Sequence, residues 1–105
     1  MSELELAVER RAGDWRIAVA GVMEYGFVEP LRQAVDAALA SDTPHVLLEL
    51  GHVSFVDSTG LALLLTADDL ARTRGGSFRL GHPGPQLRRL LETTNLDGRF
   101  DLYEG

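Results

Sequence analysis

The sequence predicts a single α/β domain, residues 1–105, in which a mixed sheet of four to five strands carries its helices mainly on one face. Three observations predict this class. The chain opens with two stretches of period-2 alternation, its later apolar runs alternate with stretches of helical periodicity, and 105 residues can bury one hydrophobic core. The predicted order is β-β-α-β-α-β-α-β, and strands joined through helices are expected to pair in parallel.

An N-terminal hairpin accounts for the first two strands. Leu4, Leu6 and Val8 alternate with glutamates, as expected for a strand with one buried face. Gly13 and Asp14 then predict a tight turn. The second alternation, over residues 15–20, has alanines between its large apolar residues. This strand is therefore expected to be more buried than the first.

The middle of the chain predicts a helix and then a buried strand. Residues 21–26 are expected to be irregular, and Pro30 suits the first turn of a helix, where its missing N–H costs nothing. Apolar residues at helical spacing continue to residue 39, and residues 41–44 end the helix. The compact apolar run 46–50 predicts a central strand covered on both faces. Residues 51–56 are expected to form a loop.

Two more helices and two short strands complete the prediction. Helical periodicity begins at Thr59 and stops at Gly75 and Gly76. Residues 77–80 predict a short strand, and residues 82–85 predict a turn. Residues 87–91 predict a last short helix, and residues 100–103 a closing strand.

Composition excludes several classes of function. The formal net charge is -6, whereas a protein that binds duplex DNA needs a basic face to neutralise phosphates, so direct nucleic-acid binding is not expected. The chain has no cysteine, which removes thiol nucleophiles and iron–sulfur clusters. Its first residues are acidic rather than basic, and its longest uncharged apolar stretch, residues 58–67, is too short to span a bilayer. We expect a cytoplasmic protein without membrane contact.

One segment carries the chemistry: Asp57, Ser58, Thr59 and Gly60 follow the buried strand and open the second helix. On its simplest interpretation, Asp57 or Ser58 caps the helix by accepting hydrogen bonds from its first free N–H groups. A functional interpretation uses the same geometry. The free N–H groups and the positive dipole end of a helix tolerate a phosphate, so phosphorylation of an exposed serine would change binding without changing the fold.

Residues 55–61, which read Phe-Val-Asp-Ser-Thr-Gly-Leu, resemble the signature loop of the STAS domain in anti-sigma factor antagonists. That pattern is an apolar pair followed by Asp-Ser-Ser/Thr-Gly-Leu, and the serine after the aspartate is the phosphorylated residue. Carried over, the serine is Ser58. The resemblance covers nearly the whole chain, from the hairpin and Gly21 to the double glycine before the fourth strand.

The resemblance implies a binding switch. The unphosphorylated antagonist binds an anti-sigma factor that is a serine kinase of the GHKL type, which frees a sigma factor. The kinase phosphorylates the serine with ATP, the complex dissociates, and a PP2C-type phosphatase resets the serine. The implied partner surface consists of Glu24, Asp57, Ser58, Thr59 and Gly60. The antagonist itself is not an enzyme and needs no cofactor.

One departure from the family pattern concerns Glu24. Members usually continue the second strand as Gly-Glu-Leu/Ile-Asp, whereas this chain reads Gly-Val-Met-Glu at residues 21–24. Glu24 keeps a carboxylate that could meet a basic patch on a partner, and it could equally be a solvated loop acid. The change bears on which kinase is recognised.

Other sites find little support. Ser58 lacks the Gly-x-Ser-x-Gly frame of a serine hydrolase, and the three histidines show no metal-ligating spacing. The alternative to the phosphorylated switch is a constitutive STAS interaction module, a non-enzymatic subunit of a transporter or of a sensory or stress-signalling complex.

Overall fold

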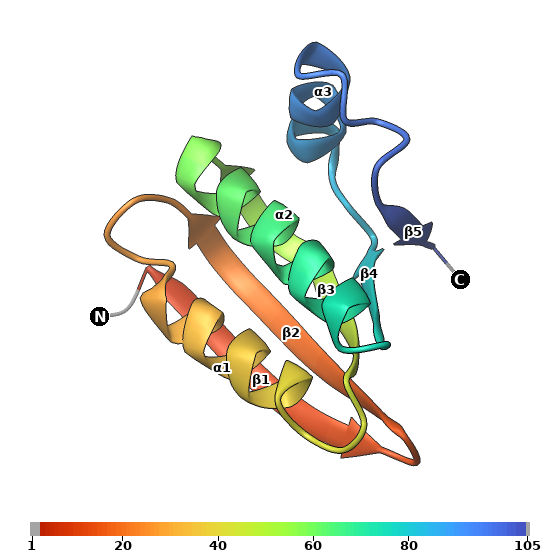
Figure 1. Ribbon diagram of the computed structural model, residues 1–105. Helices are drawn as coiled ribbons and strands as arrows, with labels where there is room; N and C mark the ends of the chain where they lie inside the picture. The colour runs from red at the N-terminus through yellow and green to blue at the C-terminus, as the bar shows by residue number, and fades with distance from the viewer. Residues whose placement is uncertain (1–2, 105) are drawn as a thin grey trace.

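The structure, a computed structural model, describes residues 3–104. The positions 1, 2 and 105 of the predicted domain therefore lie outside the described residues. The elements follow in the predicted order (Figure 1). They are β1 (Leu4–Arg11), β2 (Asp14–Met23), α1 (Glu29–Leu39), β3 (His45–Val56), α2 (Ser58–Thr73), β4 (Ser77–Gly81), α3 (Pro85–Thr93) and β5 (Asp101–Tyr103).

The strands form one mixed sheet, as predicted. Their spatial order is β1-β2-β3-β4-β5, with β1 antiparallel to β2 and the other three pairings parallel. Helices α1 and α2 lie on the same face of the sheet (Figure 1). Because parallel strands share their direction, β2, β3 and β4 all end at one edge, and the segments that follow them begin there.

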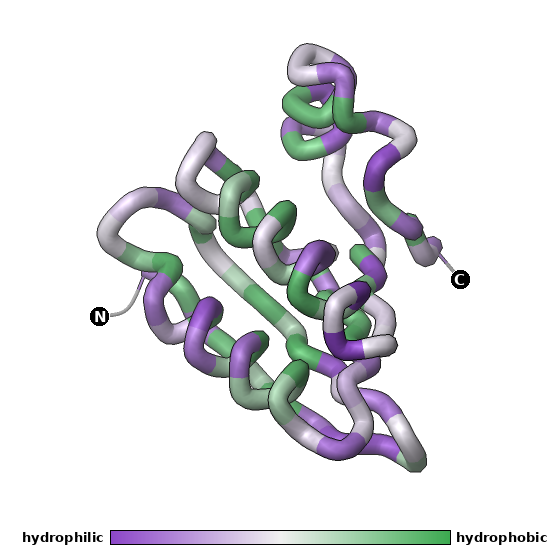
Figure 2. Tube along the Cα trace, viewed as in Figure 1, coloured by the Kyte–Doolittle hydropathy of each residue, from purple (hydrophilic) through white to green (hydrophobic). Residues whose placement is uncertain are grey.

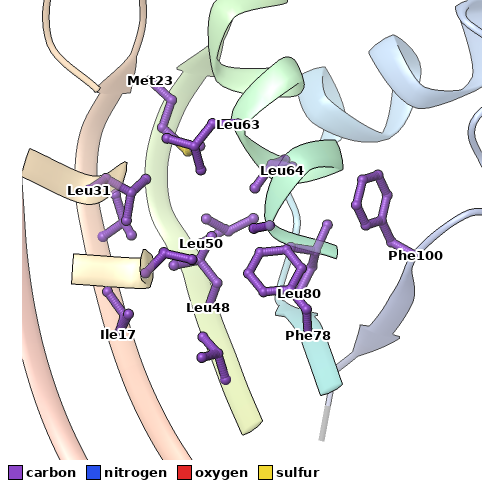
Figure 3. Close-up of a cluster of buried hydrophobic side chains, with 14 of the residues drawn as sticks. Ile17, Met23, Leu31, Leu48, Leu50, Leu63, Leu64, Phe78, Leu80 and Phe100 are labelled. Atoms are coloured by element: carbon purple, nitrogen blue, oxygen red, sulfur yellow. The ribbon is translucent and has the colours of Figure 1, made fainter. Parts of the chain in front are cut away.

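A single cluster of buried side chains lies between the sheet and the helices. Leu48 and Leu50 of β3 lie beside Leu31 of α1 and Leu64 of α2 (Figure 3). The short helix α3 joins the same cluster. Along the tube in Figure 2, α1 alternates between hydrophilic and hydrophobic segments with each turn, which is the pattern of a helix with one buried face.

The first part of the central strand, residues 46–50, is largely buried on both sides, although only one side carries helices in Figure 1. Leu47 is buried, yet it does not belong to the core cluster beneath the helices. In the sheet it pairs with Arg16 on β2 and with Arg79 on β4. The long aliphatic stems of arginines can cover neighbouring apolar surface while their charged ends reach water.

The predicted loop over residues 51–56 is wrong, because β3 continues through these residues to Val56. Likewise β2 continues to Met23, so only the later part of the predicted irregular segment 21–26 lies outside a strand. The two strands remain paired here, but their register shifts twice, between Ala18 and Ala20 and between Gly21 and Val22. These irregularities break the period-2 pattern by which a strand is recognised in a sequence.

Gly21 lies at one of these irregularities and has a φ of 110°. A Cβ at this position would come within 2.1 Å of the backbone oxygen of Glu3. The same oxygen accepts a hydrogen bond from the N–H of Val22. The glycine therefore lets β1 approach the bulged end of β2.

Candidate functional site

The predicted site residues come together where β2 and β3 end. Met23 and Val56 are paired in the parallel sheet, so Glu24 and Asp57 each follow a paired residue at the same edge. The N–H of Asp57 donates a hydrogen bond of 3.1 Å to the backbone oxygen of Met23. In Figure 1 the loop from β2 to α1 and the first turn of α2 lie at the same end of the molecule.

Asp57 joins these two segments through its carboxylate. Its Oδ1 accepts a hydrogen bond of 2.9 Å from the N–H of Gly60, which makes Asp57 the N-cap of α2. Its Oδ2 accepts a bond of 3.0 Å from the N–H of Tyr25, in the loop between β2 and α1. One side chain thus caps the helix and holds the neighbouring loop.

The environment of Asp57 favours its ionised form. Partial burial raises the pKa of the carboxyl group. Hydrogen bonds from the backbone N–H groups of Gly60, Tyr25 and Thr59 lower this pKa by more than burial raises it. The net pKa therefore lies below its ordinary value. Asp57 is a fixed negative charge at the helix start at neutral pH.

Gly60 allows the first turn of α2 to pack directly on the end of β2. A Cβ at this position would lie 2.5 Å from the backbone oxygen of Met23 and 2.9 Å from Cγ1 of Val56. Both distances are shorter than a van der Waals contact, so a larger residue would push the helix away from the sheet. Gly60 fixes the height of the helix start above the strand ends.

Ser58 is the first residue of α2, one residue before the predicted start, and it is exposed. Of the two capping candidates, Asp57 is the cap, so the fold does not use the Ser58 hydroxyl for this purpose. Within residues 3–104, that hydroxyl has no hydrogen-bond partner. The hydroxyl lies at the positive end of the helix and is accessible.

Glu24, which follows β2, and Thr59, which follows Ser58 in α2, are both partly buried. The backbone oxygen of Glu24 accepts a hydrogen bond from Phe27, which closes the loop into a turn. Its carboxylate has no ion-pair partner among the described residues, so it remains available to a cation. Thr59 lines a groove between α1 and α2.

Three aromatic residues in the segments that meet at the site are exposed, and the sequence pattern singled out only Phe55, as the first of the apolar pair before Asp57. Tyr25 is 81% exposed, Phe27 38% and Phe55 41%. Tyr25 and Phe27 come from the loop before α1, and Phe55 comes from the end of β3. Large aromatic side chains gathered on a surface are typical of protein-binding sites. For Tyr25 and Phe27, the available signal in the sequence was that two aromatic residues flank Gly26 at the end of a segment expected to be irregular.

Two further features bear on the possible chemistry. Within residues 3–104, no group of three or more histidine, aspartate or glutamate side chains could hold a metal ion. None of the helices in the described part of the chain is long and apolar enough to cross a membrane.

Comparison with known proteins identifies the family of the chain. The family model described as "Mlab, STAS domain" matches residues 6–104. The chain is 24% identical over 102 residues to the anti-sigma F factor antagonist of Paenibacillus polymyxa, covering 96% of this chain and 87% of the relative. It is 26% identical over 99 residues to the anti-sigma-B factor antagonist of Bacillus subtilis (strain 168), covering 94% and 90%.

Solved structures give the same result. The crystal structure of an anti-sigma factor antagonist from Mycobacterium paratuberculosis superposes with a TM-score of 0.81 at 30% sequence identity. The match covers 97% of this chain and 86% of that one. The fold, the Asp-Ser-Thr-Gly helix start and these similarities lead to one conclusion: the chain belongs to the STAS domain family, and its relatives include anti-sigma factor antagonists.

Proposed function

We propose that this chain is an anti-sigma factor antagonist that binds an anti-sigma factor serine kinase of the GHKL type and loses that partner when Ser58 is phosphorylated. The observation that carries the proposal is the position of Ser58. Its hydroxyl is exposed at the first residue of α2, while Asp57 provides the cap. The hydroxyl is therefore free for a partner and for a phosphate.

Phosphorylation of Ser58 would change the surface more than the fold. Transfer of the γ-phosphoryl group of ATP to Oγ releases ADP and adds about 1.5 to 2 negative charges at neutral pH. The dipole of α2 favours an anion at this end, although the N–H groups of Thr59 and Gly60 already donate to Asp57. The ionised carboxylate of Asp57 repels the phosphate, which directs it toward solvent and hence toward a bound partner.

The surrounding residues suit a protein partner. Glu24 offers a carboxylate for a basic group, and Thr59 adds a partly exposed side chain beside the serine. Asp57 and Gly60 contribute by positioning the surface that the partner contacts: Asp57 holds the loop that carries Tyr25, and Gly60 sets the start of α2. Tyr25 and Phe55 provide exposed aromatic area, and buried aromatic contacts supply much of the binding energy in protein interfaces.

The cycle needs two partners with opposite effects. The kinase both binds the antagonist and modifies it, and a PP2C-type phosphatase removes the phosphate and restores binding. The antagonist is a substrate of both and catalyses neither step. Since ATP and sigma factors are cytoplasmic, the proposed location is the cytoplasm.

Phosphopeptide mapping of the protein from its native host is the first experiment. Ser58 is expected to carry the phosphate. Ser54 and Thr59 are the nearest alternatives, since Ser54 is also exposed and donates to the backbone oxygen of Gly21. Phosphate only on one of these would move the switch to that residue. No phosphate under any growth condition would favour the constitutive STAS module.

Binding measurements with matched variants complete the test. Ser58→Ala should bind the anti-sigma factor and resist release by ATP, whereas Ser58→Asp should not bind. Thr73→Asp is the control, because it adds the same carboxylate to an exposed residue at the other end of α2. It should bind like the unmodified protein. Equal affinity of Ser58→Asp and Thr73→Asp would disprove the switch.

A further inference from the structure

An apolar groove of about 570 Å³ lies between α1 and α2. Val28 and Val35 line it from the side of α1, and Leu63 and Ala67 line it from the side of α2. A volume of this size can accept one or more large side chains. Ala62, an exposed residue of α2, also lines the groove and leaves it open because its side chain is small.

The rim of the groove on α1 is negatively charged. Arg32 lies between Glu29 and Asp36, and it donates a hydrogen bond of 3.1 Å from Nε to Glu29 and one of 3.4 Å from Nη1 to Asp36. Two carboxylates therefore surround one guanidinium, which leaves a net charge of about -1 by their ordinary ionisation at neutral pH. Since Arg32 is already paired with both acids, it is a poor anchor for an added anion, and the rim favours a cation.

The groove is continuous with the surface around Ser58. Tyr25, in the loop that Asp57 holds, lines it, and so does Thr59, next to Ser58 in α2. The side chain of Tyr25 is 81% exposed, so it can close over a residue bound in the groove. A partner that covers Ser58 would therefore also contact the groove, because both lie on the surface formed by α2 and the loop before α1.

We propose that this groove receives an apolar side chain of the anti-sigma factor that is flanked by a lysine or arginine. The apolar side chain occupies the space between α1 and α2, and the basic side chain lies at Glu29 and Asp36. This inference rests on the proposed function, because it extends the surface around Ser58 to a second contact. The groove anchors the partner, and Ser58 controls its release.

The test fills the groove without disturbing the core. Ala62→Trp places a large side chain in the groove from an exposed position, and Ala37→Trp, at an exposed position of α1 outside the groove, is its matched control. Affinity for the anti-sigma factor kinase is measured by titration calorimetry with unphosphorylated proteins. Ala62→Trp should bind roughly ten-fold more weakly than the unmodified chain, and Ala37→Trp within about two-fold of it. Circular dichroism melting checks that both variants fold.

A second variant tests the charge of the rim. Asp36→Lys reverses one exposed carboxylate and should weaken binding roughly three-fold at low salt, with a smaller effect at high salt. Unchanged affinity of Ala62→Trp, in a system where Ser58→Asp abolishes binding, would overturn the groove proposal alone. If the unmodified chain and Ser58→Ala bind no anti-sigma factor kinase of the native host, the proposed function fails and the groove proposal fails with it.

Discussion

At the scale of single residues, Asp57 links the helix that carries Ser58 to the loop that carries Tyr25. Each of its two carboxylate oxygens accepts a backbone N–H from a different segment. Hydrogen bonds to a charged acceptor are about twice as strong as those between neutral groups. The geometry around Ser58 therefore depends on the charge of its neighbour.

The charge of Asp57 should make stability depend on pH. Its folded-state pKa lies below the ordinary value of 3.8, so its contribution is fully present above that pH and is lost as the pH falls through the folded pKa. Asp57→Asn keeps an oxygen for the cap but removes the charge. At pH 6 we expect this variant to be less stable by about 1 kcal/mol. The difference should shrink as the pH is lowered from 3.8 through the folded pKa, as measured by urea unfolding.

The control for this experiment is Asp97→Asn, which removes the same charge from an exposed residue. No hydrogen bond or ion pair of its carboxylate is found within residues 3–104. Its stability should follow that of the unmodified protein at pH 6 and throughout the acid range. A difference between Asp57→Asn and the unmodified chain that persists unchanged at low pH would contradict the role of the charge.

Gly60 sets the contact between α2 and the end of β2. We expect Gly60→Ala to reduce the free energy of unfolding by about 1–3 kcal/mol, because its Cβ meets the Met23 oxygen at 2.5 Å. Gly98→Ala is the matched change, since a Cβ there meets nothing within 4 Å, and it should cost less than about 0.5 kcal/mol. Denaturant titration compares the two. Equal stabilities would mean that the helix start tolerates a shift.

At the scale of secondary-structure elements, an ion pair on a buried aspartate joins α2 to the segment between α3 and β5. Asp68 of α2 is only 6% exposed. It accepts a hydrogen bond of 3.0 Å from Nε of Arg99, and its Oδ2 lies 3.1 Å from Nη2 of Arg72. Arg99 also donates to Asp69 at 2.6 Å. The end of the chain is thereby attached to the helix that carries the site.

The two arginines should differ in their effect on stability. Arg99→Ala is expected to destabilise the fold more than Arg72→Ala, because it leaves the buried carboxylate of Asp68 with only the more exposed of its two partners. Arg72→Ala removes a mostly exposed partner, 64% by side chain, and should cost about 0–1 kcal/mol. Urea unfolding of both variants measures the difference. An equally small cost for both would show that Arg99 does not hold the C-terminal segment.

At the scale of the whole molecule, the sheet and its three helices share one hydrophobic core. The cluster extends from Leu4 at the start of β1 to Phe100 before β5. Domains of this size with a single core usually unfold in one cooperative transition. The surface around Ser58 should therefore persist or be lost with the whole fold.

Cooperative unfolding can be measured with two signals. Trp15, the one tryptophan of the chain, lies in β2 and donates to Oγ of Ser41 at 3.0 Å, so its fluorescence reports the N-terminal half. Phe100→Ala removes a core side chain at the other end and should cost about 3–5 kcal/mol. Fluorescence and far-ultraviolet circular dichroism should shift together. Loss of helical signal before the Trp15 signal would indicate separate folding units.

The sequence by itself determined the types and the order of the elements, because these depend on local periods of 2 and 3.6 residues. It also placed Asp57, Ser58 and Gly60 at the start of α2, since a cap and a close-packed glycine are local features. The same locality explains the error over residues 51–56. That part of β3 has no regular alternation, and only its pairing with β2 makes it a strand.

Only the tertiary structure decided what the site consists of. The N–H of Tyr25 reaches Asp57 across 32 residues, and the aromatic and groove residues come from segments just as distant. Their meeting depends on the register between β2 and β3, which contains two shifts that no local pattern encodes. The tertiary structure also determines that Asp57, and not Ser58, is the cap of α2. The carboxylate of Asp57 gains a second partner from the neighbouring loop, and the hydroxyl of Ser58 is left without a hydrogen-bond partner within residues 3–104.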